Sequence, residues 1–245
     1  MGASGPSTVV ILCGGRGTRL QEHTQSIPKP LVEIGGRPIL WHVMEIYVCQ
    51  GFRRFVLCLG YRGELIEEFV EDADWPEGTE VICAPTGLET QTGGRIKRVA
   101  EYLRDETFCA TYADGVADID LARLCAHHDA HDALATVTVV RPELQFGVAE
   151  IGADGRVRGF REKPRSQHWI NGGFFCFEPG VLDYLEGNSV LEREPLERLS
   201  ADGELVAFRH DGFWDCMDTY KDALMLNDMW AAGDAPWRVW EPTVR

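Results

Sequence analysis

The sequence is short of positive charge. It contains 24 Lys and Arg residues against 39 Asp and Glu residues, so its formal net charge is −15. This balance disfavours nonspecific binding to nucleic acid or to an anionic membrane surface, because both of those partners are polyanions. If so acidic a chain binds a phosphate ligand, it needs basic residues gathered in one place, or divalent cations.

Long apolar segments are also missing. No run of 18 apolar residues occurs, which predicts that no helix crosses a membrane. Residues 1–8 are small and polar, without the basic and then apolar segments that are typical of a signal peptide. We therefore expect a cytoplasmic protein with neither a membrane nor a nucleic-acid partner.

None of the eight cysteines forms a CxxC pair, so the spacing of a structural zinc site is absent. Cysteine packs as a small hydrophobic residue inside apolar segments. Five cysteines lie in such strand-like segments, and we expect them to be buried, reduced thiols: Cys13, Cys58, Cys83, Cys109 and Cys176.

Strands and helices alternate through the first half of the chain. The continuous β-branched segment at residues 8–13 predicts a buried strand. Hydrophobic spacing predicts further strands at 55–59, 80–84, 107–112 and 135–140, and helices at 38–50, 64–71, 95–103 and 121–131. This βαβα order predicts an α/β protein with a doubly wound, mostly parallel, Rossmann-like sheet.

The second half has a different pattern. Segments 148–151 and 157–161 flank Ala-Asp-Gly, which is typical of a hairpin turn. Strands are expected at 169–177 and 205–210, and helices at 192–201 and 220–231. We expect a small antiparallel addition to the same sheet, and one domain over residues 1–245.

The first predicted strand leads into CGGRGTRL, residues 13–20. Glycines allow the backbone amides to approach an anion closely, and Arg16 and Arg19 add charged, forked donors. A P-loop would require Lys-Ser/Thr where Thr-Arg occurs, and a dinucleotide fingerprint would require a small residue at Leu20. A plain glycine turn after a strand remains the alternative.

Lys29 lies between two prolines in PKPLVEIGGRPIL, residues 28–40. The prolines stiffen the segment, so this lysine is a candidate for a fixed phosphate contact. An ordinary solvated lysine is the alternative interpretation.

Together, GGRGTRL and PKPLVEIGGRPIL resemble the opening signature of the sugar-1-phosphate nucleotidyltransferases, in particular the glucose-1-phosphate cytidylyltransferases. The resemblance extends over nearly the whole chain, through TGGRIKRV (92–99), YADGVADID (112–120), REKP and WINGGFF (161–175), EPLERLSADGEL and FWDCMDT (194–219) and APWRVW (235–240). It implies a fold of the nucleotidyltransferase or GT-A type. It also implies a nucleotide-binding half at about residues 8–140, a sugar-phosphate-binding half at about 141–232, and a homo-oligomer.

The resemblance also implies residue roles. The implied catalytic residues are Arg19, Lys29 and Lys163. The implied nucleotide contacts are Leu12, Gly14, Gly15, Gly17, Thr18, Arg19, Lys29, Thr92, Gly94 and Arg95. The implied sugar-phosphate contacts are Gly147, Glu162, Lys163, Asn171 and Gly172. Mg²⁺ is the implied cofactor, held by Asp114 and Asp218.

Some of these acidic residues have simpler interpretations. Asp114 follows a predicted strand, where a functional carboxylate is expected, but Asp218 could instead cap the last helix. Asp118 and Asp120 form a DxD motif, which in many glycosyltransferases binds metal; we favour the interpretation that they begin a helix. The histidines at 127, 128 and 131 are expected on a polar helix face.

The resemblance implies in-line attack by a sugar 1-phosphate on the α-phosphorus of a triphosphate, with release of pyrophosphate. The best expectation is CDP-glucose from CTP and glucose 1-phosphate. The sequence departs from the family in the short segment 72–79 and at Ile27, Pro85, Leu88 and Ala113. Three alternatives therefore stay open: dTTP, GTP or UTP with another sugar 1-phosphate; a GT-A glycosyltransferase; and an inactive nucleotide-binding regulator.

Overall fold

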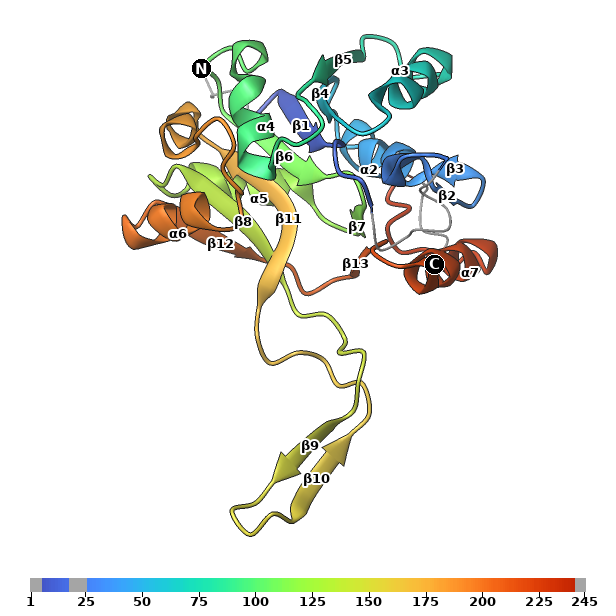
Figure 1. Ribbon diagram of the computed structural model, residues 1–245, viewed down its shortest axis with the longest axis vertical. Coiled ribbons are helices and arrows are strands. Elements are labelled where there is room, and N and C mark those ends of the chain that lie inside the picture. The colour runs from blue at the N-terminus through green and yellow to red at the C-terminus, as the bar shows by residue number, and fades with distance from the viewer. Residues whose placement is uncertain (1–5, 18–25, 241–245) are drawn as a thin grey trace.

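A seven-stranded sheet forms the centre of the computed structural model, which describes residues 6–17 and 26–240 (Figure 1). The strand order is β12-β8-β11-β6-β1-β4-β5. The strands are β1 (Thr8–Leu12), β4 (Arg54–Leu59), β5 (Glu80–Pro85), β6 (Phe108–Tyr112), β8 (Ala135–Val140), β11 (Ile170–Phe177) and β12 (Leu205–Arg209). Of these seven, only β11 runs antiparallel to its neighbours. The expected mostly parallel α/β sheet is therefore confirmed.

Helices cover both faces of the sheet. They are α2 (Ile39–Val48), α3 (Gly63–Asp72), α4 (Thr92–Arg98), α5 (Leu121–Asp129), α6 (Glu194–Ala201) and α7 (Tyr220–Ala231), with short 3-10 turns η2 (Lys29–Leu31), η3 (Ala100–Tyr102) and η4 (Pro179–Tyr184). Side chains alternate along β1, so Val9 and Ile11 face α2, α5 and α7, whereas Val10 faces α4 and α6. Burial of each such side chain contributes about 1.5–3 kcal/mol to stability.

The predicted hairpin of β9 (Val148–Ile151) and β10 (Val157–Arg161) is present. The sequence predicts that it joins the central sheet, and this part of the prediction is wrong. It forms a separate two-stranded sheet at the end of a long arm, residues 141–169 (Figure 1). The residues between β8 and β9, and between β10 and β11, carry the hairpin past the end of the central sheet, so no sheet edge lies alongside it. The antiparallel member of the central sheet is β11 instead.

Two short antiparallel pairs lie near the carboxyl ends of the parallel strands. β7 (Gly115–Ala117) pairs with β13 (Trp214–Cys216), and β2 (Glu33–Ile34) pairs with β3 (Arg37–Pro38). The amide of Met217 also donates to the carbonyl of Asp114, at 2.9 Å. The β7–β13 pair therefore joins two segments that are far apart in the sequence.

One predicted helix differs in its extent. The segment expected as a helix over 95–103 is α4, which begins at Thr92 and ends at Arg98, followed by η3. The amides of Val99 and Tyr102 bond to carbonyls three residues back, so the last turns are tighter than an α-helix.

A bulge interrupts β11. Gly173 and Phe174 both have positive φ, at 73° and 50°, and the register with β8 shifts between Asn171 and Phe175. Phe174 is nevertheless fully buried, and its carbonyl accepts a hydrogen bond from the Thr138 hydroxyl at 2.7 Å. This strained backbone is therefore held by packing on one side and by a hydrogen bond on the other.

Among the described residues, no helix is both long enough and apolar enough to span a bilayer.

Candidate active site

A cavity of about 270 Å³ lies where β1 and β6 end. Ligands of open α/β sheets bind at this edge. The cavity brings together seven of the residues that the sequence assigned to nucleotide binding and one assigned to metal: Leu12, Gly14, Gly15, Gly17, Lys29, Thr92, Arg95 and Asp114. Two other assigned residues, Thr18 and Arg19, lie outside the described residues.

Three charged side chains meet at the mouth of this cavity. The Lys29 ammonium lies 2.6 Å from an Asp114 carboxylate oxygen and 3.1 Å from an Asp218 oxygen. Lys29 is largely buried, and the two carboxylates are about one-quarter to one-third exposed. The two aspartates therefore share one cation position, although they come from different halves of the chain.

The position of each member follows from its local structure. Lys29 begins η2 directly after Pro28, and the turn is closed by the Val32 amide donating to the Lys29 carbonyl. Asp114 lies between β6 and β7, and Asp218 lies between β13 and α7. The pairing of β7 with β13 thus fixes the two carboxylates at the same edge of the sheet.

The environment keeps Lys29 charged. Burial alone would lower the pKa of the Lys29 ammonium, but the Asp114 and Asp218 carboxylates outweigh that effect and raise it. A cation is therefore stabilised between the two carboxylates at neutral pH.

Arg95 supports the glycine loop from behind. Its buried guanidinium donates to the Gly14 carbonyl at 3.1 Å, to the Leu59 carbonyl at 3.0 Å and to the Thr86 hydroxyl at 2.6 Å. A Cβ on Gly14 would lie only 2.0 Å from this guanidinium. Gly14 is thus needed for close packing on Arg95, while Gly15 has open space in front of it.

The beginning of α4 is closed by a loop. The Gly94 amide donates to the Ser189 carbonyl at 3.0 Å, and a Cβ on Gly94 would clash with Gly187. The Thr92 hydroxyl donates to a Glu192 oxygen at 2.7 Å. Gly94 therefore contributes to packing, whereas Thr92 lines the cavity.

Sequence reasoning missed Tyr112 and Glu192. The Tyr112 hydroxyl donates to Glu192 at 2.5 Å and accepts from the Asn171 amide at 3.0 Å. Since Thr92 donates to the same Glu192 carboxylate, hydrogen bonds connect Thr92, a predicted nucleotide contact, to Asn171, a predicted sugar-phosphate contact. The position of Tyr112 at the end of β6, two residues before Asp114, could have indicated its importance.

The remaining sugar-side residues divide into two groups. Asn171 and Gly172 lie in β11 beside the cavity wall, where the Gly172 carbonyl accepts from the Trp214 indole at 2.7 Å. Gly147 and Glu162 adjoin each other on the arm. Within the described residues, no hydrogen bond or ion pair connects Glu162 or Lys163 to Lys29, Asp114 or Asp218.

The simpler interpretations can now be compared with the geometry. Thr219, not Asp218, caps α7, in a capping box with Asp222. Asp120 caps α5 by accepting from the Arg123 amide, and Asp118 lies 3.0 Å from the His210 ring nitrogen. The DxD motif therefore begins a helix, as we had favoured.

One of the three histidines does not lie on the expected polar face: His131 is exposed and His127 partly exposed, but His128 is not. His128 is buried, and its ring nitrogen lies 2.8 Å from the Thr136 hydroxyl, because its position on α5 faces the sheet.

The model of the nucleotidyl transferase family matches residues 8–215, which is most of the chain. The protein therefore belongs to the nucleotidyl transferase family.

Two relatives named for an activity match the chain over almost its full length. The chain is 46% identical to the probable glucose-1-phosphate cytidylyltransferase of Bacillus subtilis, covering 94% of this chain and 99% of the relative. It is 44% identical to the glucose-1-phosphate cytidylyltransferase of Salmonella typhimurium, covering 95% and 99%. Among solved structures, HddC from Yersinia pseudotuberculosis superimposes with a TM-score of 0.71 at 25% identity, covering 91% and 99%.

Asp215, in β13 near the cluster, has an unusual carboxyl group. Burial raises its pKa from 3.8 to about 6, although the Cys216 amide donates to it at 2.8 Å. Because the folded-state pKa is raised, ionised Asp215 destabilises the fold above the unfolded-state pKa. This cost is absent below about pH 4, grows as the pH rises to about 6, and is complete above that.

We predict that Asp215→Asn stabilises the protein at pH 7.5 by at most about 3 kcal/mol, less any solvent screening, and that the gain disappears toward pH 4. Urea unfolding at several pH values measures this. Asp132→Asn, at an exposed position, is the matched control and should change little. A gain that is the same at every pH would contradict the assignment.

Proposed function

We propose that the protein joins CTP to glucose 1-phosphate and releases CDP-glucose and pyrophosphate. The observation that carries this proposal is the meeting of Lys29, Asp114 and Asp218 at the mouth of the glycine-loop cavity. The choice of CTP and glucose is supported by the two relatives at 46% and 44% identity, which are named for that reaction.

In this mechanism, an oxygen of the sugar 1-phosphate attacks the α-phosphorus of the triphosphate. The new P–O bond forms as the bond to pyrophosphate breaks, and the electron pair leaves on pyrophosphate. The attacking group is already an anion, so no side chain needs to act as a nucleophile. The protein's task is to align the two substrates and to stabilise the negative charge.

Each residue has a role in that task. The amides of Gly14, Gly15 and Gly17, with Thr18 and Arg19, would bind the β- and γ-phosphates. Lys29 would stabilise the α-phosphate, and Leu12, Thr92, Gly94 and Arg95 would shape the nucleotide side. On the sugar side, Lys163 would hold the attacking phosphate, and Gly147, Glu162, Asn171 and Gly172 would contact the sugar.

The residues at the cluster fit a divalent cation. Two carboxylates already share one positive group, the Lys29 ammonium, which stands in for a metal ion, and both are partly exposed, so water or phosphate oxygens could complete a coordination shell. We propose that Asp114 and Asp218 hold Mg²⁺, which prefers oxygen ligands. When bound, the ion would neutralise phosphate charge.

The choice of cytosine and glucose is supported by the order of sequence identities among the relatives. A mannose-1-phosphate guanylyltransferase catalytic subunit from Drosophila melanogaster is 32% identical to this chain, whereas the two cytidylyltransferases are 46% and 44% identical. Pro85 and Leu88 lie at the end of β5 and in the loop that follows it, near the cavity, and the Leu88 carbonyl lies 3.5 Å from the Arg95 guanidinium. This loop is the part of the site where another base would have to be accommodated.

We predict that pyrophosphate release is fastest with CTP and glucose 1-phosphate. The measurement pairs each of CTP, UTP, GTP and dTTP with a panel of sugar 1-phosphates. Preference for another pair would retain the reaction class and reject CDP-glucose. No pyrophosphate with any pair would reject the reaction itself.

We predict that Asp218→Asn lowers metal-dependent turnover by roughly a hundredfold or more, the cost typical of removing one group that stabilises transition-state charge. The fold should be retained, since Thr219 caps α7. Asp118→Asn is the matched control: it should retain most of the activity, because Asp118 pairs with His210 away from the cluster. Loss of activity in Asp118→Asn alone would favour the glycosyltransferase alternative.

We also propose that the protein is a homo-oligomer that associates through the arm. The hairpin projects away from the body (Figure 1), and Phe146, Ile151, Val157 and Phe160 are 60–79% exposed on it. An isolated two-stranded hairpin is at best marginally stable in water. A second copy of the chain would bury these apolar side chains.

We predict that Phe160→Glu shifts the native mass, measured by light scattering after size exclusion, toward the monomer. Leu224→Glu, which changes an exposed apolar side chain in the same way on α7 of the body, is the control and should leave the mass unchanged. A wild-type protein that is monomeric at micromolar concentration would contradict this proposal.

A further inference from the structure

Three cysteines that are far apart in the sequence converge within the core. Cys109 in β6 and Cys176 in β11 are direct partners across an antiparallel pair, with their sulfurs 3.8 Å apart. Cys125 reaches them from α5, and its sulfur lies 4.0 Å from that of Cys176. All three sulfurs lie within 4.8 Å of one another, and none is in a disulfide.

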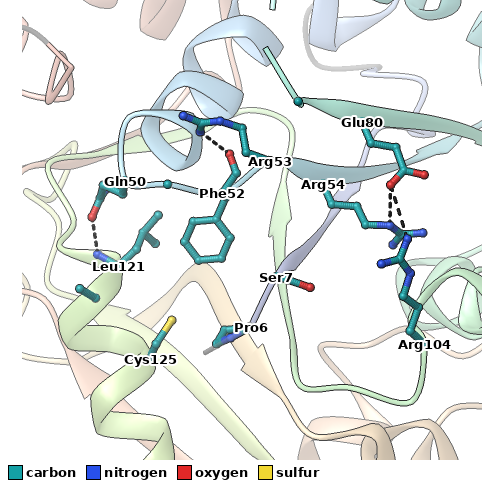
Figure 2. A pocket seen from close by; sticks show the side chains of 13 residues that line it. Pro6, Ser7, Gln50, Phe52, Arg53, Arg54, Glu80, Arg104, Leu121 and Cys125 are labelled. Carbon is teal, nitrogen blue, oxygen red and sulfur yellow. Dashed lines mark hydrogen bonds and ion pairs between the residues drawn. The ribbon is translucent and has the colours of Figure 1, made fainter. Parts of the chain in front are cut away.

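The cluster adjoins a cavity at Cys125. Cys109 and Cys176 are fully buried, but Cys125 is half-buried and lines a cavity of about 430 Å³. Figure 2 shows the Cys125 side chain at the wall of this cavity, with Pro6, Leu121 and Phe52 around it. An ion entering this cavity would meet Cys125 first.

This cavity is distinct from the candidate active site. It is lined by residues at the amino ends of the parallel strands, including Arg54 and Glu80, which begin β4 and β5. The Lys29, Asp114 and Asp218 cluster lies at the carboxyl ends. The cysteine cluster is therefore not a part of the reaction site.

We propose that Cys109, Cys125 and Cys176 bind one thiophilic divalent metal ion of the zinc class, Zn²⁺ or Cd²⁺. Zinc–thiolate bonds are about 2.3 Å long, so two sulfurs on one ion lie about 3.8–4.0 Å apart in tetrahedral or trigonal geometry. Two of the three separations, Cys109 to Cys176 and Cys125 to Cys176, lie in this range, and the third is within 4.8 Å, so a small side-chain rotation brings all three sulfurs onto one ion. The cavity beside Cys125 leaves room for a water molecule as a fourth ligand.

Charge also favours a divalent ion. Three buried thiolates alone would be strongly disfavoured, whereas three thiolates with one divalent ion carry a single net negative charge. Metal binding requires thiolates, so it releases the protons of the three thiols to solvent.

The test is a titration of the reduced protein with Cd²⁺, without oxygen and with excess Mg²⁺ present to occupy the carboxylates. We expect sulfur-to-cadmium charge-transfer absorbance that saturates at one equivalent. Cys125→Ser should lose this absorbance and weaken binding roughly a hundredfold or more, since even outer-shell losses cost up to that much. Added Cd²⁺ or Zn²⁺ should raise the unfolding temperature of the wild type, but not of Cys125→Ser.

Two control variants separate this cluster from other thiols. Cys83 is also half-buried and lies outside the cluster, and Cys216 lies in β13 near Asp114. Cys83→Ser and Cys216→Ser should both bind Cd²⁺ as the wild type does. The proposal fails if the wild type gives no charge-transfer absorbance, if Cys125→Ser binds equally well, or if only Cys216→Ser loses binding.

Discussion

The Lys29 ammonium between Asp114 and Asp218 is the interaction on which the arrangement of the site depends. It connects a turn near the start of the chain to segments from the middle and the end, at distances of 2.6 and 3.1 Å. Two carboxylates this close would repel each other in a partly buried place unless a cation lay between them. The same requirement makes the position suitable for a metal ion when phosphates compete for the lysine.

The backbone around this cluster is organised by polar side chains that bond to other segments of the protein. The Arg95 guanidinium donates hydrogen bonds to the Gly14 and Leu59 carbonyls and to the Thr86 hydroxyl, and so holds the glycine loop at the end of β1. Glu192 joins Thr92 and Tyr112 in a similar way. A preorganised loop loses little freedom when an anion binds, which is the condition for electrostatic stabilisation of a transition state.

Much of this molecule could be predicted from its sequence. The alternation of apolar segments with helical spacing predicts the parallel sheet, and the predicted strands at 135–140, 148–151 and 157–161 have the observed bounds. The placement of Asp114 after a strand also indicates the edge of the sheet at which Lys29, Asp114 and Asp218 meet. These features depend on local pattern, which sequence expresses directly.

Other features depend on contacts between distant segments. The separate hairpin follows from the length of the connections at 141–147 and 162–169, for which the turn signal carries no information. The hydrogen bonds of Arg95 to the Gly14 and Leu59 carbonyls could not be predicted, because these partners belong to other elements. The convergence of Cys109, Cys125 and Cys176 likewise could not be predicted from the spacing of the cysteines in the sequence, because it depends on the strand order that places β6 beside β11.

The bulge at Gly173 and Phe174 divides β11 into two halves with different surroundings. Before it, Asn171 bonds to Tyr112 and Gly172 to Trp214; after it, Phe175, Cys176 and Phe177 are fully buried between the layers. Each half of the strand therefore has its own alternation of inward and outward side chains. Substitutions can thus accumulate in the first half while the packing of the second half stays unchanged.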